Sequence, residues 1–194
     1  MLCIFHFFRN LTDCQDCIEG WYCGGSGLTN PTDYCDSGYY CDGRATRKDW
    51  KQCPTGHRCS GRDQPEPCPP GFYQNEAGKF DCKPCEPGYY CSDIPITHYL
   101  NYTCPTGYYC PRQTAYATQF PCPRGKFNNL TIRRDERDCI LCTGGYSCDE
   151  PGLSSPYKLC AAGYYCRQGA NITTPTYGND ANVCPPGYYC PGGE

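Results

Sequence analysis

The chain has 194 residues, of which 22 are cysteine, and a formal net charge of −3. A cysteine content of about one residue in nine marks a disulfide scaffold, and because cytosolic thiols are kept reduced, it predicts an oxidising, extracellular location. Leu, Ile, Val and Met number only eight, seven, one and one, too few for the core of a globule of this length, so crosslinks must supply much of the stability. The lack of a basic run argues against a nucleic-acid or anionic-membrane surface, and no stretch of about 18 apolar residues could span a bilayer.

The chain starts with an apolar stretch, residues 1–8, that is short and lacks both a basic region and a small-residue cleavage site. This stretch is a poor signal peptide. We therefore expect the chain to be a fragment of a longer exported protein.

A single motif, Cys-x-x-Gly-x-x-Cys, then recurs eight times, mostly at intervals of 18 or 19 residues. A fixed period of this kind indicates a repeat protein. The copies are Cys17–Cys23, Cys35–Cys41, Cys53–Cys59, Cys85–Cys91, Cys104–Cys110, Cys142–Cys148, Cys160–Cys166 and Cys184–Cys190.

Three of the copies carry an N-terminal extension with two further cysteines. These cysteines are Cys3 and Cys14, Cys68 and Cys82, and Cys122 and Cys139. Three long units of four cysteines and five short units of two account for all 22. The order long-short-short, long-short, long-short-short defines three super-repeats as the domains, residues 3–67, 68–121 and 122–194, and the last of them reads as truncated.

The motif predicts a tight reversal that is closed by a local disulfide. Its glycine adopts a positive φ without steric cost, and the reversal brings the two cysteines within bonding range. The Tyr-Tyr pair that often follows the glycine places one ring over the local disulfide and the other against a proline or the neighbouring unit. Spacers rich in Pro, Gly, Ser, Thr, Asn and Asp favour turns, and the best charged run, residues 133–138, is too short for a strong helix. We expect small disulfide-rich repeats in an elongated linear array, with short β-hairpins and coil and no helical core.

The cysteines are expected to pair with their neighbours in the order in which they occur along the chain. The short units favour this arrangement because each holds only two cysteines. Connectivity is not fixed by sequence alone. A crossed arrangement, first with third and second with fourth, is the alternative for the long units.

Three Cys-x-x-Cys spacings match zinc-ligand pairs and redox motifs: Cys14–Cys17, Cys82–Cys85 and Cys139–Cys142. Each lies inside a longer four-cysteine frame, and no thioredoxin-like pattern surrounds it. We therefore favour disulfides over a metal or a redox centre.

The remaining candidates for chemistry do not assemble into a site. His6, His57 and His98 fall in different units, and no motif matches a Ser or Cys nucleophile to them. The acidic residues in 13–16 and 149–150 do not match the cluster of calcium-binding EGF modules and are interpreted as solvated charge. We expect no enzymatic activity, no cofactor and no metal.

Four Asn-x-Ser/Thr sequons, at Asn10, Asn101, Asn129 and Asn171, predict N-glycans on an exported chain. Asn10 and Asn129 hold equivalent positions between the first and second cysteines of long units. Both are therefore expected to lie on large, accessible loops.

The segment CPPGFYQNEAGKFDCKPCEPGYYC, residues 68–91, resembles the cysteine-rich module of ephrin receptors, the GCC2/GCC3 type of EGF-like repeat. The CPxGYYC strings are similar to tandem arrays of that module in large surface proteins of protists and algae, including mastigoneme (flagellar-hair) proteins. The resemblance covers essentially the whole chain, with departures at His6, at Lys126 and at His57-Arg58, which replaces Tyr-Tyr. Tumour-necrosis-factor-receptor modules are less similar.

The repeats and the resemblance imply a structural or adhesive segment of a large extracellular glycoprotein, such as a filament, flagellar-hair or surface-coat component. Its partners would be other copies or segments of the same assembly, together with N-linked glycans. The alternative is the ligand-binding ectodomain of an ephrin-receptor-like or TNF-receptor-like surface receptor.

The expected linear array has a measurable consequence in solution. A compact globule of this length would have a radius of gyration of about 16 Å, whereas eight locally closed units in line should form a rod on the order of 100 Å long, with a radius of gyration of roughly 30 Å or more. Small-angle X-ray scattering of the disulfide-intact chain measures this quantity. A value near the compact limit would contradict the linear array.

Overall fold

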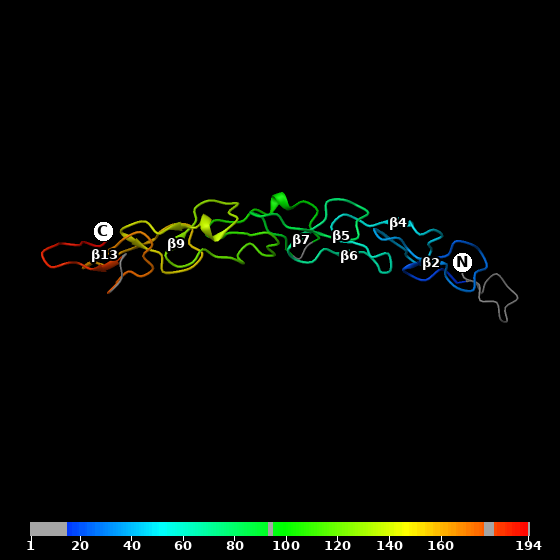
Figure 1. Ribbon diagram of the computed structural model, residues 1–194, viewed down its shortest axis with the longest axis horizontal. Helices are drawn as coiled ribbons and strands as arrows, with labels where there is room; N and C mark the ends of the chain where they lie inside the picture. Colours follow the sequence, from blue (N-terminus) through cyan, green and yellow to red (C-terminus); the bar gives the residue numbers. More distant parts are fainter. Residues whose placement is uncertain (1–14, 93–94, 177–180, 194) are drawn as a thin grey trace. The chain divides into compact units, whose positions relative to one another are not determined.

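The computed structural model describes residues 15–92, 95–176 and 181–193, and its regular elements are very short (Figure 1). The described residues form seven two-stranded antiparallel sheets and no α-helix. Two 3₁₀ helices, η2 (Tyr99–Asn101) and η3 (Glu136–Asp138), are single turns. The prediction of small disulfide-rich repeats with short hairpins, coil and no helical core is therefore confirmed. The paired strands are β1 (Trp21–Tyr22) with β2 (Asp33–Tyr34), β3 (Tyr39–Tyr40) with β4 (Lys51–Gln52), β5 (His57–Arg58) with β6 (Glu66–Pro67), β7 (Phe72–Tyr73) with β8 (Lys83–Pro84), β9 (Lys126–Phe127) with β10 (Ile140–Leu141), β11 (Tyr146–Ser147) with β12 (Lys158–Leu159), and β13 (Tyr164–Cys166) with β14 (Ala181–Val183).

The chain divides into two compact units. The first comprises Met1–Pro84 with Cys91–His98, and the second comprises Cys85–Tyr90 with Tyr99–Glu194. Strands β1 to β8 belong to the first unit and β9 to β14 to the second. These two units are defined by contacts in space, whereas the three super-repeats are defined by periodicity along the sequence. The super-repeats therefore remain a prediction.

One rule generates all seven sheets. The residues that follow a motif glycine pair with the residues that precede the first cysteine of the next Cys-x-x-Gly loop; Tyr39 of β3, for example, lies opposite Gln52 of β4, which precedes Cys53. The same register continues as single bridges at Tyr89–Thr103 and Tyr108–Pro121. Each hairpin therefore ends where the next disulfide loop begins.

The motif glycine ties each hairpin to the following one. The N–H of Gly38 donates to the carbonyl of Cys59 (3.0 Å), and the carbonyl of Gly38 accepts from the N–H of Cys53 (2.9 Å). Cys53 and Cys59 form one disulfide, so a single residue, Gly38, holds both ends of the next loop. The same pair of bonds occurs at Gly20, Gly88, Gly125, Gly145 and Gly163.

Glycine is required at these positions for two reasons, which Gly107 illustrates. Its φ of +84° lies in the left-handed region that residues with a Cβ rarely adopt. A Cβ on Gly107 would also overlap the carbonyl oxygen of Gly152. The turn therefore needs both the conformational freedom of glycine and the space that its missing side chain leaves.

The core is a series of small clusters built around the disulfides. Tyr164, the first residue after its glycine, packs on its own Cys160–Cys166 bond. Phe127, the second residue after its glycine, is buried against the following Cys142–Cys148 bond. One ring thus covers the local disulfide and another covers the neighbouring one, as the Tyr-Tyr pattern predicts.

The glycine argument predicts different costs for Gly107→Ala and Gly163→Ala. Both glycines have nearly the same φ, +84° and +83°, but the added Cβ meets nothing within 4 Å at Gly163. Gly163→Ala should therefore cost only the backbone strain, about 1–2 kcal/mol, and Gly107→Ala a further ~1–3 kcal/mol from overlap. Thermal denaturation of the disulfide-intact variants measures both, and equal costs would contradict the close-approach argument.

Candidate functional site: the disulfide frame and its exposed asparagines

Every cysteine in the described part of the chain is disulfide-bonded. Neighbours along the chain are brought together, with Cα–Cα distances of 5.8 Å in Cys68–Cys82 and 5.7 Å in Cys122–Cys139. The crossed alternative therefore does not occur in these two long units. The other bonds are Cys17–Cys23, Cys35–Cys41, Cys53–Cys59, Cys104–Cys110, Cys142–Cys148, Cys160–Cys166 and Cys184–Cys190. Cys85 and Cys91 are also bonded, and the predicted Cys3–Cys14 pair lies outside the described residues.

In the two long units that begin at Cys68 and Cys122, a buried amide takes the position of the second half-cystine of the motif. Gln74 and Asn128 each lie six residues after the first cysteine, and their side chains are 2% and 0% exposed. The carbonyl of Asn128 accepts from the N–H of Gly107 (2.7 Å), as a half-cystine carbonyl does elsewhere. Its side-chain Nδ2 donates to the carbonyl of Tyr108 (3.0 Å), and its Oδ1 accepts from the N–H of Leu130 (3.0 Å).

Gln74 is satisfied in the same way. Its Nε2 donates to the carbonyl of Asp81 (2.6 Å), and its Oε1 accepts from the N–H of Glu76 (3.1 Å). Two hydrogen bonds per amide thus replace one covalent bond, and the first cysteine of the unit is released to close the larger loop. Sequence reasoning missed both residues, although aligning Cys68 and Cys122 on the motif puts an amide in the cysteine column.

Two of the three Cys-x-x-Cys spacings, Cys82–Cys85 and Cys139–Cys142, lie wholly within the described residues, and neither forms a dithiol site. Cys82 is bonded to Cys68, and Cys139 and Cys142 are bonded to Cys122 and Cys148. A bonded sulfur offers no thiolate to a metal. Among the residues that the structure describes, no group of three or more His, Cys, Asp or Glu side chains could hold a metal ion.

The sequon asparagines within the described ranges are all exposed: Asn101 in η2, Asn129 and Asn171. Asn129 follows the buried Asn128 directly, so adjacent amides serve opposite roles, one in the frame and one at the surface. Asn10 lies outside the described residues. The exposed side chains meet the steric requirement for a glycan.

The two histidines within the described residues, His57 and His98, lie in separate hairpins. The ring Nδ1 of half-buried His57 is 3.1 Å from the carbonyl oxygen of Thr55, and His98 is exposed. His6 lies outside the described residues. These positions do not bring a histidine to a nucleophile.

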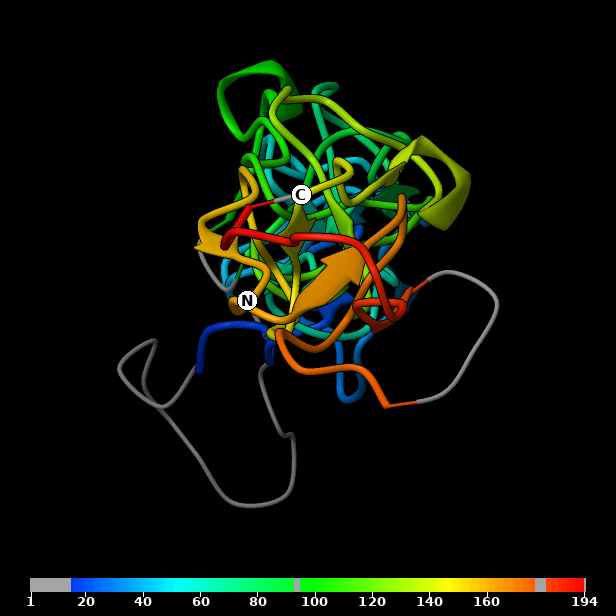
Figure 2. The same ribbon diagram turned by 90° about the vertical axis from the view of Figure 1, so that its left-hand side faces the viewer.

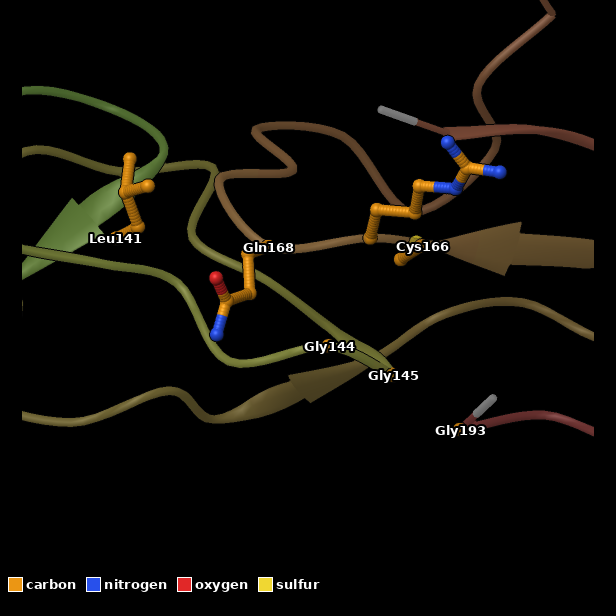
Figure 3. A pocket seen from close by; sticks show the side chains of 7 residues that line it. Leu141, Gly144, Gly145, Cys166, Gln168 and Gly193 are labelled. Atoms are coloured by element: carbon orange, nitrogen blue, oxygen red, sulfur yellow. The ribbon is translucent and has the colours of Figure 1, made fainter. Parts of the chain in front are cut away.

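An open pocket in the second unit is lined by three glycines and four residues with larger side chains (Figure 3). Its lining residues are Leu141, Gly144, Gly145, Cys166, Arg167, Gln168 and Gly193. The amide of Gln168 turns toward the loop that carries Gly144 (Figure 3). Arg167 supplies the one charged group among these lining residues, so they hold no acid–base pair and no nucleophile.

Two aspartates form matching polar clasps in separate hairpins. Asp42 accepts from Trp50 Nε1 (3.0 Å) and from Lys51 Nζ (2.6 Å). In the second clasp, Asp149 accepts from the hydroxyl of Tyr157 (3.2 Å) and from Lys158 Nζ (2.6 Å). Each aspartate directly follows a motif cysteine, and the aromatic residue and the lysine lie eight and nine residues further on.

The interpretation of Asp149 as solvated charge was therefore wrong: its side chain is 27% exposed and paired. The recurring Asp-x7-aromatic-Lys spacing was the missed signal. Hydrogen bonding by Lys158 and then by Tyr157 lowers the pKa of Asp149 from its ordinary value of 3.8, and Lys51 lowers the pKa of Asp42 in the same way. Bonding to Asp149 in turn raises the pKa of Lys158.

Comparison with known proteins adds no relative. No protein-family model matches the chain, and no curated protein matches it significantly. Within the described ranges, no helix has the length and apolar character needed to cross a membrane.

The aspartate clasps predict a pH dependence of stability. Because the pKa values of Asp42 and Asp149 are lower in the folded chain, their contribution is complete above about pH 4 and is lost as the pH falls through the folded values. Glu76, whose pKa is lowered to about 2 by Lys83 and Lys79, extends the loss to lower pH. Denaturation at several pH values should show a falling unfolding free energy below pH 4.

The variant Asp149→Asn should flatten this acid limb, because asparagine does not titrate. Asp63→Asn is the matched control, since Asp63 accepts a hydrogen bond from the hydroxyl of Ser60 (3.0 Å) rather than from a lysine. An acid limb that is unchanged in Asp149→Asn would show that the clasp does not contribute.

Proposed function

We propose that this chain is a structural or adhesive repeat segment of a large extracellular glycoprotein, in the manner of the GCC2/GCC3-type arrays that its motifs resemble. Filament, flagellar-hair and surface-coat components are the classes that suit it. The segment acts by holding its form rather than by catalysis. Its partners are other copies or other segments of the same assembly.

The hairpin-to-hairpin bonding carries this proposal. Six glycines of the repeat each bond both ends of the following disulfide loop, as Gly38 does with Cys53 and Cys59. The nine disulfides whose two cysteines are named above join residues that are at most 17 positions apart in the sequence. A chain stabilised by neighbour contacts and short covalent loops tolerates addition of units and resists proteolysis, and both properties suit an extracellular structural protein.

Glycans fit the same role. Asn101, Asn129 and Asn171 are exposed, and a glycan at each would add solvated bulk to a surface that has little net charge to keep copies apart. We include N-glycosylation of these residues, and of Asn10, in the proposal.

A receptor ectodomain is the second candidate, and one observation favours it. The hairpin in which His57-Arg58 replaces the usual Tyr-Tyr is also the one beside a polar pocket in the first unit, lined by Arg58, Ser60, Asp63, Gln64, Glu66 and Phe80. Phe80 is 66% exposed. A local departure from the repeat at a pocket is typical of a site that recognises a ligand.

Immunogold electron microscopy of native material, with antibodies against the oxidised chain, tests the proposal. The structural role predicts label on filaments or a surface coat, and glycopeptide mapping of the same material should find glycans at Asn129 and Asn101. Label confined to single molecules dispersed on the plasma membrane would instead support the receptor. Label in the cytosol with unmodified asparagines would contradict both.

A further inference from the structure

Positive charge is concentrated in the middle of the chain. Residues 94–134 contain five basic residues and no acidic one. These basic residues are Arg112, Arg124, Lys126, Arg133 and Arg134. Because the whole chain has a net charge of −3, the residues outside this segment carry a net charge of −8. The five cations are scattered along the segment and form no basic run, so the fold decides which of them lie together.

Most of these cations have no carboxylate partner. Lys126 Nζ lies 3.1 Å from Glu136 Oε1, but within the described ranges none of the four arginines takes part in an ion pair. The first unit is different. Nearly all of its described cations lie within ion-pair distance of a carboxylate: Arg44, Arg47, Lys48, Lys51, Arg58, Lys79 and Lys83. The four arginines therefore carry charge that the protein itself does not neutralise.

The fold brings three of these arginines close together. The N–H of Cys110 donates to the carbonyl of Arg133 (2.8 Å), so the chain at Arg133 lies beside the hairpin end that continues to Arg112. Arg134 follows directly in the sequence. The side chains of Arg112 and Arg134 are exposed and that of Arg133 is half-buried. Figure 2 shows the loop that leads into η3, in yellow-green, at the outer edge of the second unit.

The backbone at these arginines departs from the repeat. The N–H of Gln113 and the N–H of Ile132 each donate to the carbonyl of the first cysteine of a motif (2.9 Å in both). Other repeats have glycine at this position: Gly78, Gly152, Gly169 and Gly193. Gln113 and Ile132 nevertheless have positive φ, +69° and +61°, and are the only non-glycine residues to do so in the described part of the chain. Each adjoins an arginine, and backbone outliers of this kind cluster at binding sites.

The acidic residues that follow Arg134 do not cancel its charge. Asp135 is engaged by Arg137 (3.1 Å), and Glu136 is engaged by Lys126. Asp138 accepts hydrogen bonds from the backbone N–H groups of Arg134 (2.8 Å) and Asp135 (3.1 Å). The carboxylate of Asp138 thus fixes the backbone that carries the arginines, and a rigid backbone lowers the entropic cost of binding.

The type of cation indicates the ligand. All four unpaired cations are arginines, whose planar guanidinium donates two parallel hydrogen bonds to an oxyanion and is more weakly hydrated than an ammonium group. Sulfate groups are oxyanions that match both properties. Arg133 also has an unmet requirement, because its Nε is buried and has no hydrogen-bond partner among the described residues. A polysaccharide carries sulfate groups at intervals along its length, as successive turns of this fold carry the arginines.

We propose that Arg112, Arg133 and Arg134 form an arginine surface that binds a sulfated polysaccharide. The guanidinium groups donate to sulfate oxygens, and binding displaces counterions from the polyanion, so it weakens as the salt concentration rises. This partner is of a different class from the copies of the chain in the function proposed above. The inference requires only the extracellular location that the disulfides indicate, so it stands or falls separately from the structural role.

Binding of the oxidised full chain to immobilised dextran sulfate, with unsulfated dextran as the reference surface, tests the proposal. The chain should bind the sulfated polymer alone, in spite of its net negative charge. The variant Arg112→Ala/Arg134→Ala, which alters two exposed side chains, should bind about tenfold more weakly. The control Arg44→Ala/Arg47→Ala removes the same charge from ion-paired residues of the first unit and should change the affinity by less than about twofold.

Three outcomes would overturn the proposal. Absence of binding to dextran sulfate would exclude the ligand class, and equal losses in the two double variants would show that only overall charge matters. Peptide mapping under non-reducing conditions verifies that both variants keep the disulfides of the parent chain. Soluble poly-L-glutamate should displace the chain from dextran sulfate at least about tenfold less effectively than soluble dextran sulfate does at equal charge. Equal displacement would assign the arginine surface to an acidic protein segment instead.

Discussion

The structure depends on one interaction, the pair of hydrogen bonds by which a motif glycine holds the loop that follows it. Gly38 has a left-handed conformation, with a φ of +87°, so its N–H and its carbonyl both reach the following loop, at Cys59 and Cys53. Strand pairing then follows, since the residues after the glycine must run beside the residues that enter that loop. The disulfide holds the loop in the conformation to which the glycine bonds, and the two hydrogen bonds of the glycine determine the position of that loop relative to the preceding hairpin.

The frame tolerates exchange between covalent and hydrogen-bonded closure. Asn128 keeps the backbone bond from Gly107 that a half-cystine would accept, and its amide supplies two bonds of its own. Conversely, the backbone needs a left-handed residue a few positions after a loop. Gly152 takes this position after one loop, and Ile132, at φ +61°, takes it after another. Backbone register is therefore the constant feature, and side chains vary around it.

Much of this arrangement was predictable from sequence, because spacing and residue type act over a few positions. The short hairpins, the need for glycine and the packing of aromatic rings on disulfides, as at Phe127, all follow from local chemistry. Contacts between elements were harder to foresee. The clasp at Asp149 joins residues nine apart across a hairpin whose register is set by pairing, and the close approach of Gly107 to Gly152 spans two loops. Such contacts depend on how successive hairpins stack, which a linear pattern does not encode.

The direction of the glycine bonds has a consequence for biosynthesis. A disulfide loop of six residues closes soon after its second cysteine leaves the translocation channel, so oxidation can proceed loop by loop and avoid most mispairings among so many cysteines. Gly20, however, completes its bonds only when Cys35 and Cys41 have emerged. Each newly made hairpin is thus locked by the one synthesised after it, and maturation follows the polypeptide from its N-terminal side with a delay of one repeat.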